Sequence, residues 1–245
     1  MLYQIYIFII PCSLSLLIFV SASCSGYRMT VQGVNLDHFI ESRPAASDTR
    51  TKEEEAVYHN DLGVLLEREG DLDGALAQYR IARQKDPGLV FAYINAGNVL
   101  VKMNQLTEAE QLYRQALEQE PDQPQALNNL AWVLLLRGRS PADAIALLKR
   151  AIDVDRENRY LYLDSLGWAL YRDGRGEEAR ETLTRALEET PPEEDYLRGE
   201  THYHLGLICR ERGENRAADE HFKKSLEIYP SPAREAEIEK MTKSE

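Results

Sequence analysis

Apolar and small residues recur along this chain with a period close to 34 positions, from about Ala56 to Pro230. Each period brings back an apolar residue followed by a small one. The pairs are Leu62-Gly63, Ala96-Gly97, Leu130-Ala131, Leu166-Gly167 and Leu205-Gly206, and subtraction of the second members gives spacings of 34, 34, 36 and 39 residues. A period of this length indicates an array of repeated units rather than one globular core.

A second set of positions follows each pair: an alanine, then an aromatic residue or leucine, then a small residue and usually a proline. The first unit reads Ala75, Tyr79, Ala82 and Pro87, the second Ala109, Tyr113, Ala116 and Pro121, the fourth Ala179, Leu183, Ala186 and Pro191, and the fifth Ala218, Phe222, Ser225 and Pro230. The third unit, after one inserted residue, reads Ala144, Leu148 and Ala151 and puts Arg156 where the others have proline. Its closing turn is therefore the least regular.

Turn signals such as Glu69-Gly70-Asp71 and Arg212-Gly213-Glu214 divide each unit into two amphipathic halves. Glycine ends helices at little cost and proline cannot continue them, so each unit is predicted to be an antiparallel helix hairpin. The small residue on the inner side of the first helix lets its partner approach closely. Because one hairpin cannot bury its apolar face alone, we expect stacked hairpins with a shared core.

The repeated positions resemble the tetratricopeptide repeat (TPR) family over about 175 of the 245 residues. The resemblance implies an all-α fold: a right-handed superhelical array of helix hairpins (an α-solenoid) with about five TPR units and a C-terminal capping helix. It also implies that the first helices line an inner groove, which in this family commonly binds extended peptides or helices.

Carried over to this chain, that groove contains amide, aromatic and charged side chains. The candidate partner-binding residues are Asn60, Asn98, Asn128, Asn129, Trp132, Asp164, Trp168, Tyr171, Arg172 and Tyr203. Asparagine both donates and accepts hydrogen bonds, and large aromatic rings make good anchors for a peptide. The alternative is that Trp132 and Trp168 only pack between helices. A carboxylate clamp like that of some chaperone adaptors is disfavoured, because Ile94, Leu161 and Ser165 occupy its basic places.

The N-terminal residues carry a targeting signal. Residues 1–27 contain no charged side chain, and Ser21-Ala22-Ser23-Cys24 resembles the cleavage box of bacterial lipoproteins. We therefore interpret residues 1–23 as a lipoprotein-type signal peptide, and the resemblance makes Cys24 the site of lipid attachment. Three alternatives stay open: an uncleaved membrane anchor, an ordinary secretory signal, and a true start at Met29 that would leave a cytosolic protein.

The remaining boundaries follow from composition and capping signals. Residues 24–50 are polar, show no sustained helical period and are predicted to form a flexible tether. The array is expected over residues 51–230, because Thr51 and Glu54 have the spacing of a capping box. Ser231-Pro232 can open a capping helix over residues 231–245.

Charge and motifs narrow the possible functions. A net charge of -12, from 29 basic and 41 acidic residues, disfavours a nucleic-acid partner, because phosphates would be repelled. The sequence contains no recognisable catalytic or phosphate-binding motif, so we expect no enzyme, no cofactor and no metal site. His202 and His204 are two residues apart and point to different sides of a helix, so they cannot easily share an ion with His221. Cys209 is expected to be a buried apolar residue.

These observations favour a non-catalytic scaffold that is lipid-anchored in a bacterial cell envelope, faces the periplasm and binds peptide or helix segments of other proteins. Ser25 after Cys24 favours the outer membrane, because the sorting rules of bacterial lipoproteins associate aspartate at that place with the inner membrane. Similar small repeat lipoproteins serve as assembly factors for envelope complexes. The alternative is a repeat subunit or adaptor that regulates a separately encoded envelope peptidase or cell-wall hydrolase.

Overall fold

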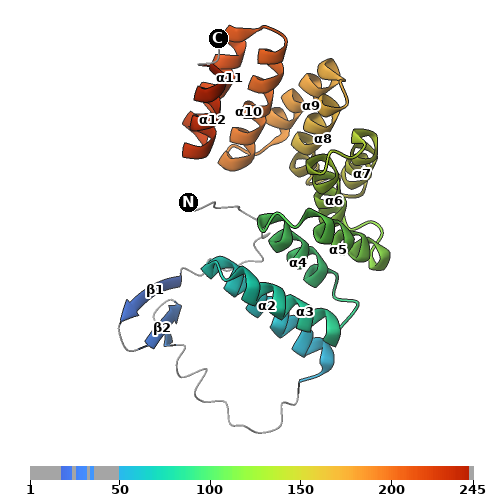
Figure 1. Ribbon diagram of the computed structural model, residues 1–245, viewed down its shortest axis with the longest axis vertical. Coiled ribbons are helices and arrows are strands. Elements are labelled where there is room, and N and C mark those ends of the chain that lie inside the picture. The colour runs from blue at the N-terminus through green and yellow to red at the C-terminus, as the bar shows by residue number, and fades with distance from the viewer. Residues whose placement is uncertain (1–17, 24–25, 32–33, 36–49, 243–245) are drawn as a thin grey trace. The chain divides into compact units, whose positions relative to one another are not determined.

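A computed structural model describes residues 18–23, 26–31, 34–35 and 50–242 of the chain. The chain divides into two units, Met1–Arg50 and Thr51–Glu245, and each is described by itself (Figure 1). In the first unit, β1 (Ile18–Ser23) pairs antiparallel with β2 (Gly26–Val31), and β2 pairs antiparallel with β3 (Val34–Asn35). The residue pattern did not predict these short strands. The predicted lipid-attachment residue Cys24 lies outside the described residues.

The second unit is built from helices alone. They are α2 (Lys52–Glu69), α3 (Leu72–Lys85), α4 (Val90–Lys102), α5 (Leu106–Gln119), α6 (Pro124–Leu136), α7 (Pro141–Val154), α8 (Tyr160–Arg172), α9 (Gly176–Glu189), α10 (Asp195–Glu211), α11 (Asn215–Ile228) and α12 (Pro232–Thr242). The helices from α2 to α11 form five consecutive hairpins, and α12 follows the last one. The predicted all-α array of about five hairpins with a terminal helix is therefore confirmed.

Local signals in the sequence define where the first hairpin begins and turns. The predicted capping box is present: the Glu54 backbone N–H donates to Thr51 Oγ1, and the Thr51 N–H donates to the Glu54 carboxylate. The turn between the two helices of a hairpin requires a left-handed residue, which is Gly70 in the first hairpin and Asn104 in the second, with φ values of 85° and 59°. Asparagine tolerates this conformation better than most residues, so Asn104 is a turn signal that the sequence analysis missed.

Within a hairpin, the small residue of the repeated pair allows a large side chain of the second helix to lie against the backbone of the first. A methyl group added at Gly97 would come within 2.6 Å of the Tyr113 ring. The third hairpin has Ala131 at the same place and the smaller, non-aromatic Leu148 opposite it. Both residues are fully buried. The first and second helices of a hairpin therefore pack by fitting one small residue to one large residue.

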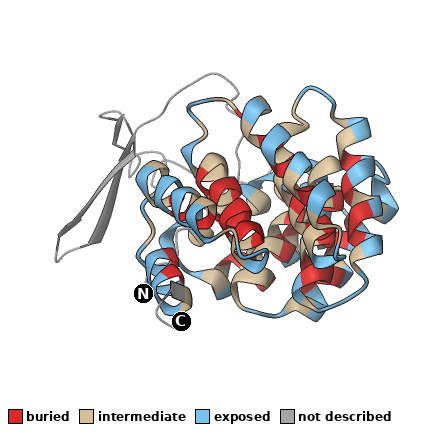
Figure 2. Ribbon diagram, turned by 90° about the horizontal axis from the view of Figure 1, so that it is seen from above, coloured by how far each residue is buried: buried red, intermediate tan, exposed pale blue. Residues whose placement is uncertain are grey.

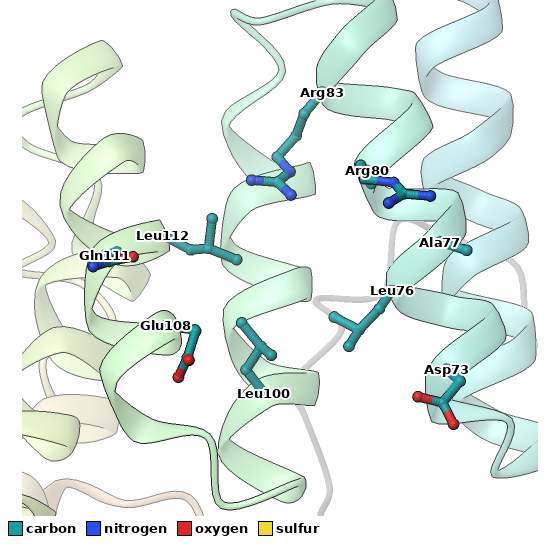
Figure 3. Close-up of a pocket in the computed structure, with 9 residues that line it drawn as sticks. All are labelled: Asp73, Leu76, Ala77, Arg80, Arg83, Leu100, Glu108, Gln111 and Leu112. Atoms are coloured by element: carbon teal, nitrogen blue, oxygen red, sulfur yellow. The ribbon is translucent and has the colours of Figure 1, made fainter.

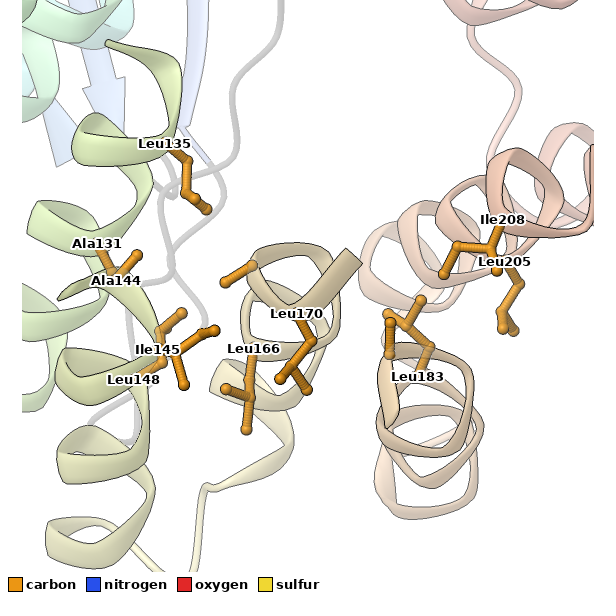
Figure 4. Close-up of a cluster of buried hydrophobic side chains, with 12 residues drawn as sticks. Ala131, Leu135, Ala144, Ile145, Leu148, Leu166, Leu170, Leu183, Leu205 and Ile208 are labelled. Atoms are coloured by element: carbon orange, nitrogen blue, oxygen red, sulfur yellow. The ribbon is translucent and has the colours of Figure 1, made fainter. Parts of the chain in front are cut away.

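Between hairpins, the apolar residues form a core that continues along the array (Figure 2). The largest buried cluster joins five successive helices, α6 to α10. Figure 4 shows its side chains, among them Leu148 from α7, Leu166 from α8, Leu183 from α9 and Ile208 from α10. Each hairpin thus buries the apolar face of its neighbour, as expected for a solenoid.

The irregular closing turn of the third hairpin, which has Arg156 in place of a proline, is held by the aspartate that precedes it. Asp155 accepts a hydrogen bond from the Asn158 backbone N–H at 3.3 Å and another from the Tyr162 hydroxyl at 3.0 Å. After the fourth hairpin, the additional residues mainly lengthen a helix, because α10 begins at Asp195 and has 17 residues, whereas α8 has 13. The unusual spacing of the last repeat is therefore largely helical.

The last helix, α12, is fixed to the fifth hairpin by a buried cation. Arg234 is 8% exposed, forms an ion pair with Glu200 and donates a hydrogen bond to Ser225 Oγ at 3.1 Å. Its guanidinium also lies over the rings of Tyr203 and Tyr229. Across the described residues, no helix combines the length and the apolar character needed to span a membrane.

Candidate partner-binding groove

The first helices of neighbouring hairpins contact one another along one side of the array: α2 meets α4, α4 meets α6, α6 meets α8 and α8 meets α10. We call this side the first-helix face. Every candidate groove residue belongs to one of these first helices: Asn60 on α2, Asn98 on α4, Asn128, Asn129 and Trp132 on α6, Asp164, Trp168, Tyr171 and Arg172 on α8, and Tyr203 on α10. Their role in binding remains a prediction.

Amide side chains link the first three helices of this face. Asn95 Nδ2 donates to Asn60 Oδ1 at 3.0 Å, and Asn129 Nδ2 donates to Asn98 Oδ1 at 2.8 Å. Asn98 Oδ1 also accepts a hydrogen bond from the Tyr113 hydroxyl at 2.7 Å. The amides therefore brace neighbouring hairpins, and their remaining donors and acceptors are what they can offer to a peptide backbone.

One amide on this face has an unmatched acceptor. Asn128 Nδ2 donates to Asn129 Oδ1 at 3.1 Å, but Asn128 Oδ1 is buried and has no hydrogen-bond partner among the described residues. An unsatisfied buried acceptor costs free energy, so a donor supplied by a partner or by water would stabilise this site. Asn128 is therefore the polar residue of this face that is best prepared to accept a hydrogen bond.

A carboxylate joins the amides at the other end of α2. Glu67 accepts a hydrogen bond from the Tyr79 hydroxyl at 3.0 Å and forms an ion pair with Lys102 at 2.6 Å. Burial raises the pKa of Tyr79, and the Glu67 charge raises it further, so this tyrosine stays a donor at neutral pH. Glu67 was not among the predicted residues, although it lies four positions after Gly63 as Tyr171 lies four after Gly167.

Aromatic rings dominate the C-terminal part of the face. Trp168 stacks on His204, with ring centroids 4.6 Å apart and planes 19° apart, and Tyr171 and the Arg172 guanidinium lie against the same indole at 5.1 and 5.9 Å. The imidazole of His204 also contacts a carboxylate, because His204 Nδ1 lies 3.0 Å from Asp164 Oδ1. An indole, an imidazole and a carboxylate thus replace the amides of the N-terminal part.

The candidate aromatic residues differ in how much surface they retain. Trp132 and Trp168 are half-buried against the core cluster of α6 to α10, so both packing and partner contact are open to them. Tyr171 is also half-buried, and burial together with Glu211 raises its pKa to about 12. Tyr203 is 9% exposed and packs against Phe222, which leaves it little surface to offer a partner.

The histidines take separate partners, as expected from their spacing. His202 Nδ1 lies 3.0 Å from His221 Nδ1 on α11, whereas His204 faces Asp164 on α8. In the part of the chain that the structure describes, no group of three His, Cys, Asp or Glu side chains could hold a metal ion. Cys209 is buried as predicted, and this burial raises the pKa of its thiol.

The contacts made by Asn95 and His204 across hairpins were not predicted, because the pattern within one helix does not show what the neighbouring helix brings to it. Asn95, Asn129 and His204 all lie two residues before the small residue of their repeat, and each contacts the preceding first helix. The repeat register could have identified this position. Only the structure shows that it is the contact point between neighbouring hairpins.

Comparison with known families accounts for most of the chain. Family models described as "Tetratricopeptide repeat" match residues 41–90, 94–159 and 160–231. A curated relative is the human protein O-mannosyl-transferase TMTC3, which is 26% identical over 178 residues. That match covers 70% of this chain but only 18% of the human protein, so this chain spans a small part of its relative's length.

Solved structures show the same architecture. The chain resembles YrrB, described as "a TPR protein with an unusual peptide-binding site", with a TM-score of 0.54 and 25% identity over 76% of this chain and 92% of YrrB. It also resembles PilW, described as a "widely conserved type IV pilus biogenesis factor", with a TM-score of 0.65 and 23% identity over 72% of this chain and 78% of PilW. The second likeness establishes the fold alone.

Proposed function

Because the chain belongs to the tetratricopeptide repeat family, whose fold is in general a non-catalytic module for protein interaction, we propose that its first-helix face captures peptide or helix segments of partner proteins. The observation that carries the proposal is Asn128. Its buried Oδ1 has no hydrogen-bond partner within the described residues, and it lies on the same helix as the half-buried Trp132. Rotation of the half-buried Asn128 side chain would present this oxygen to a peptide N–H, while a peptide side chain covered the Trp132 indole.

The two parts of the face then supply different contributions to binding. Amides between α2 and α6 provide donors and acceptors for a backbone, and they read little of the partner's sequence. The rings between α6 and α10 provide apolar area at low entropic cost, and Arg172 adds an exposed cation beside them. A segment with aromatic or aliphatic anchors and an acidic residue fits this combination. YrrB supports the assignment as a TPR protein described by its peptide-binding site.

Photo-crosslinking can test this face directly. A photoreactive residue at Phe91, which lies on α4 and is 47% exposed, should crosslink a protein in envelope membranes. The matched control is Val154, which is 46% exposed at the end of the second helix α7. Equal capture from both positions, or capture from Val154 alone, would show that the partner lies elsewhere.

The identity of the captured protein separates two pathways. Recovery of pilus or secretin components would favour an assembly factor, in line with the fold shared with PilW. Recovery of a peptidase or cell-wall hydrolase would favour the adaptor role. In either case Asn128→Leu should weaken capture from Phe91, because it removes the acceptor without removing the aromatic surface.

We also propose that the chain is anchored to the periplasmic side of a bacterial envelope membrane, with the outer membrane favoured, through lipid on Cys24. The support is the Ser21-Ala22-Ser23-Cys24 box after an uncharged apolar run. Radiolabelled palmitate should be incorporated into the native chain and lost in Cys24→Ser. Label that survives the substitution would exclude this anchor.

A further inference from the structure

A depression lies between second helices of the array, away from the first-helix face. It has a volume of about 490 Å³ and lies between α3 and α5, the second helices of the first two hairpins, with α4 beneath it. Figure 3 shows an apolar centre made by Leu76, Leu100 and Leu112. We call this site the α3–α5 notch. Its volume is in the range of sites that receive small ligands or groups of side chains.

The notch has opposite charges at its two ends. Arg80 and Arg83 lie toward one end of α3, and Asp73 and Glu108 lie toward the other end, with the leucines between them (Figure 3). Asp73 and Arg80 are seven residues apart on α3, which corresponds to about 10 Å along a helix axis. Any occupant that matches this pattern must carry a negative group and a positive group at about that separation.

Arg83 is an exception among the five hairpins. At the equivalent position, eight residues after the repeated buried alanine of each second helix, the other hairpins have Leu117, Ile152, Leu187 and Leu226. Those four side chains are half-buried and pack against the core. Arg83 is half-buried too, and its guanidinium lies 5.1 Å from the centre of the Tyr93 ring. A cation therefore stands where the repeat otherwise needs an aliphatic residue.

One polar atom of this guanidinium lacks a hydrogen-bond partner in the part of the chain that the structure describes. Arg83 Nε is buried and has no hydrogen-bond partner among the described residues. Within the same residues, no ion pair is formed by Arg83 or by its neighbour Arg80, although most other arginines of the array have a carboxylate partner. A buried donor without a partner costs free energy, so a carboxylate brought to this end of the notch would be favoured.

The next hairpin has a carboxylate at the position equivalent to one of the notch leucines. Glu110 on α5 stands at the position that Leu76 has on α3, and it is 5% exposed. It forms ion pairs with Arg114 of the same helix and with Arg137 at the end of α6. The arginines there are neutralised by the chain itself. In the α3–α5 notch, Leu76 stands in place of this carboxylate. Arg80 and Arg83 can therefore pair with a carboxylate of another molecule.

We propose that the α3–α5 notch docks a segment of a partner protein that carries an acidic residue and a basic residue about two helical turns apart, with leucine-like side chains between them. The carboxylate pairs with the guanidinium groups of Arg80 and Arg83. The aliphatic side chains cover Leu76 and Leu112, and the basic residue meets Asp73 or Glu108. This site is separate from the first-helix face, so the array can hold two segments at once.

The test uses the full chain and a designed probe. The probe is a fluorescently labelled helical peptide with one glutamate and one lysine about two turns apart and two leucines between them on the same face. Fluorescence anisotropy should show saturable binding that falls at least tenfold when the glutamate is changed to glutamine or the leucines to alanine. Absence of saturable binding at about millimolar concentration, or equal binding of all three peptides, would overturn the proposal.

Variants of the protein locate the binding. Leu76→Glu introduces the carboxylate that α5 has at the equivalent position, so it should weaken binding of the probe at least tenfold. Arg80→Glu should weaken it similarly, and a probe with lysine in place of glutamate should regain affinity for this variant. The matched control is Lys149→Glu, because Lys149 is exposed at the position in α7 that Arg80 has in α3. Loss of binding in that control would place the site elsewhere.

Two further measurements exclude trivial outcomes. Circular dichroism at the assay temperature should be the same for Leu76→Glu and the native chain, because the added carboxylate faces Arg80 one turn away. The melting temperature should be slightly lower, because Leu76 packs partly buried against the core. Sedimentation should show no difference in oligomeric state between them. If Leu76→Glu instead converts a dimer to a monomer, the occupant is a second copy of the chain and the proposed partner segment is wrong.

Discussion

The first-helix face uses different chemistry in its two parts. Between α2 and α6 the contacts between neighbouring hairpins are made mainly by amides, as in the Asn98–Asn129 pair. Between α8 and α10 the same repeat position carries His204, which contacts Asp164 and stacks on Trp168. The hairpins share one backbone plan, so a change in a few side chains makes the contacts of one part from amides and those of the other from aromatic rings and a carboxylate. The shared backbone arrangement determines where neighbouring hairpins touch, and the side chains determine the chemistry of each contact.

The largest loss of stability should be the same in the N-terminal and C-terminal halves of the array. Ala109 and Ala179 begin the packing faces of α5 and α9, and both are fully buried. Replacing either with leucine overpacks the hairpin and should cost about 3 kcal/mol of the free energy of unfolding. Urea denaturation followed by circular dichroism measures this cost. Ala146→Leu, at an exposed site on α7, is the control and should change stability by less than about 0.5 kcal/mol. A much smaller cost for one alanine would show that the two parts pack differently.

The aromatic part should depend on Trp168 for stability as well as for binding. Trp168→Ala removes the stacking on His204 and the contact with the core, so it should cost about 2 kcal/mol. Trp132→Ala should cost about half as much, because no aromatic partner of Trp132 is present among the described residues. Thermal and urea unfolding of the two single variants give the comparison. Equal costs would mean that the stacking on His204 contributes nothing.

Acid should destabilise the C-terminal part. Burial lowers the pKa of His202 to about 4, with help from the nearby charges of His221, Lys224 and Arg198. Burial also lowers the pKa of His221. Above the ordinary histidine pKa of about 6.5 the imidazole is neutral in both states, and its burial costs nothing by protonation. Below that value the unfolded chain takes up a proton that the native chain does not, so stability falls until about pH 4.

This linkage predicts a loss of about 1.5 kcal/mol between about pH 7.5 and pH 5.5 from His202 alone. Urea denaturation at the two pH values measures it. Carboxylates titrate over the same range in every variant, so the comparison is with His202→Gln, which should lose correspondingly less stability on acidification. If the native chain and His202→Gln respond equally to acid, His202 is not held neutral by the fold.

The smallest effect should come from the amide part. Asn129→Ala breaks the hydrogen bonds to Asn98 and from Asn128, and it should cost about 1 kcal/mol. Its cost should be the same at about pH 7.5 and pH 5.5, because no titrating group is removed. A cost that changes with pH would contradict the contrast between the two parts. Unfolding at both pH values decides the matter.

Much of this architecture is predictable because the repeat signals are local. The capping box at Thr51, the left-handed glycine after α2 and the small residue at Gly97 each act within one hairpin, so the sequence identifies them directly. The site was predictable in part. The repeat register assigns residues such as Asn128 and Trp168 to the first helices, but it does not distinguish Tyr203, which the structure shows to be buried against Phe222.

What the sequence determines by itself is therefore the number, order and pairing of the helices, because turns, caps and small residues depend on neighbours within one repeat. Tertiary structure decides which side chains meet across repeats. It brings His204 to Asp164 across 40 positions of the sequence and leaves Asn128 Oδ1 without a partner among the described residues. It also leaves Arg83 Nε buried without a partner in that part of the chain, whereas Glu110 pairs with Arg114 and Arg137. These features depend on the geometry with which two hairpins pack. A repeat pattern shows that neighbouring hairpins pack, but it does not show which side chains meet.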